Sequence, residues 1–341
     1  VLSSLANYNS RVGVLGMLAS LSPNHDAAII EVAQSALWMN RGPITRLLRP
    51  NVALITEIGI SQIEMVKTLE RAVRFKCMVF DGLAGNAIAV VGAHLPHFDQ
   101  VLSYARKHAK RVVIYGDHID SEIRIKNITN NYVGSKVALE TNRGSYSFSI
   151  PMPTAGMAKS AIAAFAVMYA LGEDLDKACQ NIGQYQSIEG RLLTHEVTVT
   201  GGKVTIIDDN WNALYESMVN ALSLFGGQKE ADKRFIFVLG RLVDLGEKTK
   251  EMHQSLSVPI LESQPDLVIT HGEEMKYLRE VLPEDMLGEH FDNVRELAKY
   301  LKSIWQAKDV ILIKGSRTGS DFVQVVPLLK NINEESIITN I

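Results

Sequence analysis

The sequence predicts an α/β fold in two domains, and a repeated pattern of apolar runs is the main reason. Short β-branched runs alternate with helix-length segments, as in the run at 52–56, the segment at 63–83 and the run at 87–91. Continuous apolar strands of this kind are buried on both faces, as in a parallel sheet. The pattern changes at 123–150, where polar and apolar residues alternate and predict half-exposed antiparallel strands.

A boundary near residue 190 divides the chain into a domain at 1–190 and a smaller one at 191–341. Just after it, Gly201-Gly202 separates two β-branched runs and predicts a two-residue hairpin. Apolar runs then recur at 235–240, 267–270 and 310–313. Because helix-length segments lie between these runs, we expect the second domain to be doubly wound.

Composition excludes several classes of protein. The 341 residues are 46% apolar, which suits two domains. A net charge of -3 indicates neither a nucleic-acid-binding nor a membrane-binding surface. No apolar run approaches the roughly 18 to 20 residues that a spanning helix needs, and no signal peptide is recognisable at the start. Cys77 and Cys179 lie far apart and outside any CxxC pair, so we expect a cytoplasmic protein without disulfides or zinc.

Polar residues at the ends of predicted strands are the first candidates for a site, because open α/β sheets bind ligands there. Glu31 closes the apolar run at 28–30, where a single carboxylate could hold magnesium or could simply be solvated. Lys76 lies on a predicted helix between Phe75 and Cys77. Apolar neighbours can lower the pKa of an amine, yet a lysine on a helix is commonly solvated. The residues alone leave both alternatives open.

The second domain offers two further strand ends. Asp208 and Asp209 close the second strand of the predicted hairpin, where paired acids could bind a ribose or a cation, or cap the next helix. Lys314 and Arg317 bracket a Gly-Ser turn, which is either an anion clamp or a tight surface turn. The histidines form no metal-binding pattern. Neither GxxxxGK[ST] nor GxGxxG occurs in the sequence.

Taken in order, these segments resemble the Mur ligase family, and most closely its UDP-N-acetylmuramoyl-tripeptide–D-alanyl-D-alanine ligase branch. Residues 7–14 resemble Asn-x-Asn-Asn-x-x-Gly-Val, and residues 56–64 resemble Thr-Asn-Ile-Gly-x-x-His-x-Glu. Residues 207–213 resemble Ile-Asp-Asp-x-Tyr-Asn-Ala, and residues 238–247 resemble Val-Leu-Gly-Asp-Met-x-Glu-Leu-Gly-Glu with a following histidine, here His253. Further matches are Glu31 at a strand end, Arg74-Phe75-Lys76 on the helix of a carbamylated lysine, Gly190-Arg191 at the domain junction and Lys314-Gly315-Ser316-Arg317 as the closing motif.

The resemblance implies a Mur-ligase-like central domain, with a parallel sheet and a small antiparallel part. A smaller Rossmann-like, doubly wound domain follows it. It also implies an ATP-dependent carboxylate–amine ligase that acts through an acyl phosphate, with ATP and Mg²⁺ as cofactors. The implied reaction partners are a small-molecule acyl acceptor and an amino acid or peptide amine.

The resemblance assigns roles to individual residues as well. The implied catalytic residues are Lys76, Glu31, Gln62 and Arg191. Two of these, Glu31 and the carbamate of Lys76, are the implied metal ligands. The implied nucleotide-binding residues are Asn9, Asp209, Asn212 and Lys314, and the implied substrate-binding residues are Ser316 and Arg317.

The sequence departs from the family pattern at several places. The family's phosphate-binding loop should lie upstream of residue 1, so we expect this chain to be cut from something longer. Gln62 stands where the family has a histidine, and Arg241 stands where an aspartate is usual. Residues 154–161 replace Gly-x-His-Asn-x-x-Asn-Ala. These substitutions leave an alternative open, a non-catalytic Mur-ligase-like module that binds a partner or ligand.

Overall fold

The structure, a computed structural model, describes residues 1–330 apart from 5–7, 39–41, 60–65, 133, 152–154, 188 and 227–231. The chain divides into two compact units. The first comprises Val1–Ile128, Val137–Phe148 and Lys159–Ile182, and the second comprises Thr129–Lys136, Ser149–Ala158 and Gly183–Ile341. Among the described helices, none has the length and apolar character required to cross a bilayer.

Three parallel strands form the buried half of the first unit's sheet. They are β3 (Val52–Ile55), β4 (Ile88–Gly92) and β5 (Arg111–Tyr115), paired in that order. The central strand β4 is buried from Ala89 to Gly92, which agrees with the apolar run predicted there. The carboxyl ends of the three strands therefore lie along one edge of the sheet, where we expected ligands to bind.

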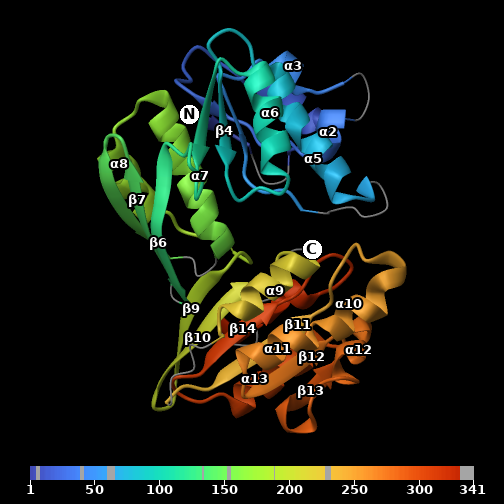
Figure 1. Ribbon diagram of the computed structural model, residues 1–341. Coiled ribbons are helices and arrows are strands. Elements are labelled where there is room, and N and C mark those ends of the chain that lie inside the picture. Colours follow the sequence, from blue (N-terminus) through green and yellow to red (C-terminus); the bar gives the residue numbers. More distant parts are fainter. Residues whose placement is uncertain are drawn as a thin grey trace. The chain divides into compact units, whose positions relative to one another are not determined.

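Three longer strands extend this sheet beyond β5, in chain order. They are β6 (Ile123–Asn131), β7 (Gly134–Thr141) and β8 (Gly144–Ile150), and short connections join them (Figure 1). Burial alternates along β7, which is the pattern of a strand with one exposed face. The structure thus contains the small strand-rich part that the sequence predicts for 123–150.

Helices flank the sheet of the first unit. They are α1 (Arg11–Ala19), α2 (Gln34–Trp38), α3 (Thr45–Leu48), α5 (Leu69–Cys77), the 3₁₀ helix η1 (Met78–Gly82), α6 (Phe98–His108), α7 (Ala155–Leu171) and α8 (Leu175–Gly183). Helix α5 is capped at its start by Thr68, whose hydroxyl accepts the backbone N–H of Arg71 at 3.2 Å. Its buried face, which includes Val73 and Cys77, packs in the same apolar core as β4. This packing fixes the position of Lys76 on the helix.

Two expectations for the first unit differ from the structure in extent. The apolar run at 28–30, which Glu31 closes, forms only the short strand β2 (Ala28–Ile29), which pairs with β1 (Leu2–Ser3) in a separate parallel sheet. Because β2 has a single short neighbour, its side chains stay exposed. The helix expected at 63–83 is shorter in the described part, since α5 starts only after its Thr68 cap and passes into η1.

The second unit is built on a six-stranded sheet in the order β13-β12-β11-β14-β10-β9. Its strands are β9 (Leu193–Val199), β10 (Gly202–Asp209), β11 (Phe235–Gly240), β12 (Leu267–His271), β13 (Leu287–Phe291) and β14 (Val310–Lys314). All neighbours are parallel except β9 and β10, which form the antiparallel hairpin predicted around Gly201-Gly202. Gly201 has a φ of 87°, a conformation that favours glycine in such turns.

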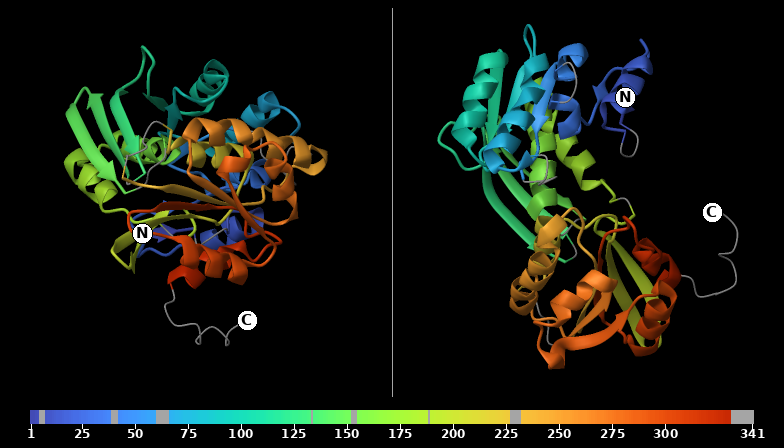
Figure 2. Two further views of the ribbon diagram at one scale, coloured as in Figure 1. Left: turned by 90° about the horizontal axis from the view of Figure 1, so that it is seen from below. Right: turned by 90° about the vertical axis from the view of Figure 1, so that its right-hand side faces the viewer.

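Helices cover both faces of this second sheet, as a doubly wound fold requires (Figure 2, left). One core packs α9 (Tyr215–Ser223), α11 (Ser257–Ser263) and α12 (Lys276–Arg279) against side chains such as Phe237. The other packs α13 (Val294–Ile304) and α14 (Val325–Lys330) against side chains such as Val238. The remaining elements are η2 (Gly246–Lys248), α10 (Thr249–Ser255), η3 (Glu273–Met275), η4 (Glu284–Met286) and η5 (Phe322–Gln324).

Candidate functional site

In the first unit, Asn9 and Glu31 meet just beyond the short strands. The Asn9 amide donates to Glu31 Oε1 at 2.7 Å, and the backbone N–H of Glu31 donates to the hydroxyl of Ser4 at 2.9 Å. The Glu31 side chain is nevertheless exposed. Magnesium usually takes one or two carboxylates and keeps several waters. An exposed carboxylate with an amide group beside it fits that ligand set.

Lys76 reaches the carboxyl end of β3 from helix α5. Its Nζ donates to the backbone carbonyl of Glu57 at 2.7 Å. Burial lowers the pKa of the Lys76 ammonium, and the Glu57 carboxylate only partly opposes that shift. The preceding residue of the helix, Phe75, stacks on Trp38 with ring centroids 5.1 Å apart. A lysine with a lowered pKa releases its proton more easily, so its amine is more available for covalent modification.

The described residues do not bring all predicted groups of the first unit together. Gln62 lies outside the described residues, as does the start of the 154–161 segment. Among the side chains that are described, no hydrogen bond or ion pair joins Glu31 to Lys76. The same part of the chain contains no cluster of three or more acidic, histidine or cysteine side chains that would bind a metal unaided.

In the second unit, Asp209 and Lys314 stand opposite each other at the ends of β10 and β14. Lys314 is fully buried, and its Nζ lies 2.6 Å from Asp209 Oδ2. Burial raises the pKa of Asp209, whereas the charge and hydrogen bond of Lys314 oppose that rise. Because such a charge is stable in the interior only when it is paired, Lys314 holds the Asp209 carboxylate in place.

Asn212 and Ser316 extend this network toward the surface of the sheet edge. The Ser316 hydroxyl donates to the side-chain Oδ1 of Asn212 at 3.0 Å, and the backbone carbonyl of Asn212 accepts from Lys314 Nζ at 3.5 Å. Ser316 Oγ in turn accepts the backbone N–H of Thr318 at 3.1 Å, which shapes the turn after β14. The four predicted residues Asp209, Asn212, Lys314 and Ser316 are therefore connected by direct hydrogen bonds.

Two predicted arginines share a single aromatic ring beside this network. The guanidinium carbon of Arg317 lies 3.4 Å from the centroid of Trp211, and that of Arg191 lies 5.8 Å from the same centroid. Gly190 is held at this place as well, because the backbone N–H of Trp211 donates to the Gly190 carbonyl at 3.0 Å. Two guanidinium groups at one ring create a strongly cationic position that suits a phosphate or a carboxylate.

Two further polar residues follow or end parallel strands of the same sheet and were not among the predicted site residues. Arg241, which follows β11, donates to Glu274 Oε1 at 2.8 Å, and its carbonyl accepts the Ser316 N–H at 3.2 Å. His271 ends β12 and is buried, with Nε2 3.4 Å from Asp321 Oδ1. Burial lowers the pKa of His271. Their signal in the sequence was the same strand-end position that identified Asp209.

His253 has a structural function. Its Nδ1 donates to the Thr249 carbonyl at 2.7 Å, and its Nε2 accepts the backbone N–H of Leu242 at 3.1 Å. Both ring nitrogens are thus used by the backbone, which fixes the neutral tautomer and holds the loop that follows Arg241. Burial lowers the pKa of His253 in agreement with this arrangement.

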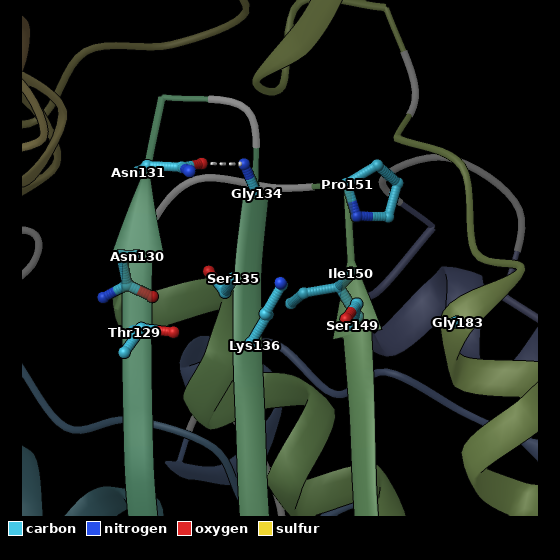
Figure 3. A pocket seen from close by; sticks show the side chains of 10 residues that line it. All are labelled: Thr129, Asn130, Asn131, Gly134, Ser135, Lys136, Ser149, Ile150, Pro151 and Gly183. Carbon is cyan, nitrogen blue, oxygen red and sulfur yellow. Dashed lines mark hydrogen bonds between the residues drawn. The ribbon is translucent and has the colours of Figure 1, made fainter.

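Two pockets within the units lie away from these residues. The larger one, of about 470 Å³, lies at the ends of β6, β7 and β8, where Asn131 Oδ1 accepts the Gly134 N–H at 3.0 Å (Figure 3). Its lining contains none of the predicted site residues: Thr129, Asn130, Asn131, Gly134, Ser135, Lys136, Ser149, Ile150, Pro151 and Gly183. The smaller one, of about 350 Å³, is lined by Ser121, Glu122, Arg124, Glu140, Thr141, Asn142 and Tyr169.

Comparisons with known proteins agree with this architecture. The family model of the Mur ligase middle domain matches residues 1–168, and that of the Mur ligase glutamate ligase domain matches residues 190–317. The UDP-N-acetylmuramoyl-tripeptide–D-alanyl-D-alanine ligase of Rickettsia prowazekii is 27% identical over 93% of this chain and 69% of the relative. That of Haemophilus influenzae is 28% identical over 93% of this chain and 67% of the relative.

Solved structures share the fold along nearly the whole chain. MurF from Acinetobacter baumannii aligns with a TM-score of 0.82 at 22% identity, over 97% of this chain and 71% of that one. The MurF ligase of Thermotoga maritima in complex with ADP aligns with a TM-score of 0.78 at 20% identity, over 96% and 73%. With both domain models matched in order and this fold in common, the chain belongs to the Mur ligase family of ATP-dependent, peptide-bond-forming ligases.

Proposed function

We propose that this protein joins the carboxylate of a peptide-bearing small molecule to the amine of a dipeptide, at the expense of ATP. The relatives' names supply the candidates, namely UDP-N-acetylmuramoyl-tripeptide as acyl donor and D-alanyl-D-alanine as amine. The observation that carries the proposal is the hydrogen-bonded group of Asp209, Asn212, Lys314 and Ser316 at the end of β10 and β14. A ligase needs such a fixed polar group to orient charged substrates.

The first unit supplies the phosphoryl-transfer groups in this proposal. Glu31, with Asn9 beside it, would hold magnesium, which neutralises charge on a transferring phosphoryl group when it is bound. Lys76 would act as a carbamate and bind a second ion, because carbamylation turns the lysine cation into an anion. Gln62 would contribute its amide where relatives of this pattern carry an imidazole.

The second unit supplies nucleotide and amine contacts. Asp209 and Asn212 would face the nucleotide, and the fully buried Lys314 would act on it by holding Asp209. Arg317 and Ser316 would bind the carboxylate of the amine substrate, with Arg191 stabilising negative charge at the junction. The cationic pair of Arg317 and Arg191 at Trp211 supports this assignment.

In this proposal the two domains have different functions. We assign the phosphoryl-transfer role to residues 1–190 and the nucleotide and amine contacts to residues 191–341. The family models end at 168 and resume at 190, and the second compact unit takes up the chain continuously from Gly183, which supports a boundary in this stretch.

The test is ADP release by the intact protein with ATP, Mg²⁺, UDP-N-acetylmuramoyl-tripeptide and D-alanyl-D-alanine. We expect turnover that requires both substrates. Lys76→Ala and Glu31→Ala should each lower kcat by about a hundredfold or more, because each removes a group that stabilises the transferred phosphoryl charge. Single amino acids in place of the dipeptide define the preferred amine.

Lys126→Ala is the matched control for this test. Lys126 is an exposed lysine of the same unit, paired with Glu140 at 3.1 Å, and such surface pairs contribute little. The control should keep wild-type turnover. Equal turnover in the wild type, Lys76→Ala and Glu31→Ala would reject the proposed site.

A further inference from the structure

Two consecutive backbone carbonyls follow strand β3, and each accepts a hydrogen bond from a different element. The Glu57 carbonyl accepts from Lys76 Nζ of helix α5 at 2.7 Å. The Thr56 carbonyl lies 3.4 Å from Nε2 of His94, in the turn after β4. Because a carbonyl only accepts, Nε2 is the protonated nitrogen of His94. The Glu57 carbonyl, which binds Lys76, therefore directly follows the Thr56 carbonyl, which binds the imidazole of His94.

Packing at the end of β4 fixes the position of the His94 ring. A Cβ added at Gly92 would lie 2.5 Å from His94 Cε1 and 2.8 Å from Tyr115 Cζ, so both rings pack over the bare α-carbon of this glycine. The His94 and Tyr115 rings are in a tilted contact, with centroids 5.8 Å apart and an interplanar angle of 55°. Only 18% of the His94 side chain is exposed. The end of β4 thus holds the imidazole in one place.

The Glu57 carboxylate makes a second contact between His94 and the same segment. Oε2 of Glu57 lies 3.9 Å from His94 Nε2, and Oε1 accepts the backbone N–H of Ile58 at 3.1 Å. The Glu57 side chain is about half exposed, so this pair is weak by itself. Together with the bond to Thr56, it places His94 Nε2 between two acceptors on adjacent residues. Both contacts restrain residues 56 and 57, and the Glu57 carbonyl that accepts from Lys76 belongs to the next peptide of this segment.

We propose that His94 is a positioning residue for Lys76, acting through the 56–57 peptide segment. This inference rests on the proposed role of Lys76 as a carbamate. Carbamylation forms a bond between the neutral lysine nitrogen and the carbon of CO₂. One C=O electron pair moves to oxygen, and one N–H proton passes to water. The carbamate nitrogen keeps a single hydrogen, which continues to donate to the Glu57 carbonyl. That one bond then sets the direction of the new carboxylate.

In this proposal, the orientation of the Glu57 carbonyl depends on the Nε2–H group of His94 as a hydrogen-bond donor. Loss of the Nε2–H frees the Thr56 carbonyl and lets the Glu57 carbonyl turn away from Lys76. Groups that orient metal ligands in this way typically contribute ten- to hundredfold to activity or metal affinity. A substitution that keeps an N–H donor of similar reach should retain most of that effect.

The experiment compares His94→Leu with His94→Gln in the intact protein, with His97→Asn as control. His97 is an exposed histidine in the same turn with a φ of 52°, a conformation that asparagine tolerates. The first readout is the Lys76 carbamate signal after equilibration with ¹³C-bicarbonate, with Lys76→Ala as the blank. The second is kcat and KM for ADP release over a range of bicarbonate concentrations.

For His94→Leu we expect a weaker or shifted carbamate signal and a kcat lowered by about tenfold or more, with KM for ATP within about twofold. The kcat of His94→Gln should lie within about threefold of the wild-type value, and the control His97→Asn should have the wild-type kcat. A wild-type carbamate signal and kcat in His94→Leu would overturn the inference. Equal losses in His94→Gln and His94→Leu would also overturn it, because the donor would then be irrelevant.

The same data separate this inference from the proposed function. If the wild type is active and Lys76→Ala is not, while His94→Leu behaves as wild type, only the role of His94 is rejected. If the wild type shows neither turnover nor a carbamate signal that Lys76→Ala abolishes, the proposed function fails and the inference fails with it.

Discussion

At the scale of single residues, the second unit shows how a buried charge is made stable by its partner. Lys314 has no exposed surface, and Asp209 is its direct ion-pair partner at 2.6 Å. Breaking a buried pair costs more than replacing it whole, because the remaining charge stays desolvated. This asymmetry gives a test of the pair that does not depend on activity.

Lys314→Met should lower the free energy of unfolding by about 3–5 kcal/mol, since it leaves Asp209 unpaired. The double variant Lys314→Met/Asp209→Leu should recover a large part of that loss. Urea unfolding of the wild type, both single variants and the double variant measures the coupling. Additive effects of the two substitutions would contradict the ion pair.

Buried histidines make the stability of the molecule depend on pH. Burial lowers the pKa of His253 below its ordinary value of 6.5, so the unfolded chain binds this proton more readily than the folded one. The unfolding free energy should therefore fall as pH drops below about 6.5, by up to about 1.4 kcal/mol per pH unit for one group. Unfolding midpoints between pH 8 and 5 should decline less in His253→Gln than in the wild type. Parallel curves for the two proteins would contradict this assignment.

The sequence could reveal those candidate residues whose position at the end of a predicted strand places them at the edge of the sheet where ligands bind. Asp209 and Lys314 end apolar runs, and parallel strands bring such ends to one edge. The same rule could have found His271, which ends β12. It could not have found the contact between His94 and the Thr56 carbonyl, because a backbone acceptor carries no residue-type signal. Nor could it show that Lys314 points inward to Asp209.

At the scale of elements, continuous apolar runs were reliable predictors and short ones were not. The runs at 235–240 and 310–313 became central strands, each paired on both sides, so their burial matched their composition. The run at 28–30 is also apolar but became a two-residue strand with one neighbour. Pairing partners lie far away in sequence, so composition alone could not show this difference.

Close contact between β11 and β14 leads to a prediction about Gly315. A Cβ there would lie 2.7 Å from the α-carbon of Gly240 and 2.6 Å from Phe322 Cδ1. Gly315→Ala should therefore push the strand ends apart and lower stability by about 1–3 kcal/mol. Turnover should fall as well, because Ser316 and Arg317 follow directly.

Gly16→Ala is the control for that substitution. Gly16 lies inside helix α1, and an added Cβ meets nothing within 4 Å. Alanine there should leave stability unchanged or raise it by about 0.5–1 kcal/mol, since glycine is the weaker helix former. Thermal unfolding and ADP release of both variants decide the outcome. Wild-type behaviour of Gly315→Ala would show that the strand ends separate without cost.

At the scale of the whole molecule, the predicted α/β fold and the Mur ligase resemblance are both confirmed, and the ligase interpretation with them. The comparisons give no support to the alternative of a non-catalytic module. The order and spacing of motifs made this recognition possible, although identity to the relatives is only 27% and 28%. The domain limits at 190 and 191 and the individual site roles stay predictions.

Because each unit has its own apolar core, we expect the two units to unfold in separate transitions. Phe237 is fully buried in the second unit, so Phe237→Ala should lower that unit's stability by about 3–5 kcal/mol. Tryptophan fluorescence can follow the units separately. Trp38→Phe leaves only Trp211 and Trp305 of the second unit, and the double variant Trp211→Phe/Trp305→Phe leaves only Trp38 of the first. Phe237→Ala should shift the urea midpoint in the first background and not in the second. Equal shifts in both backgrounds would instead mean that the chain unfolds as one cooperative unit.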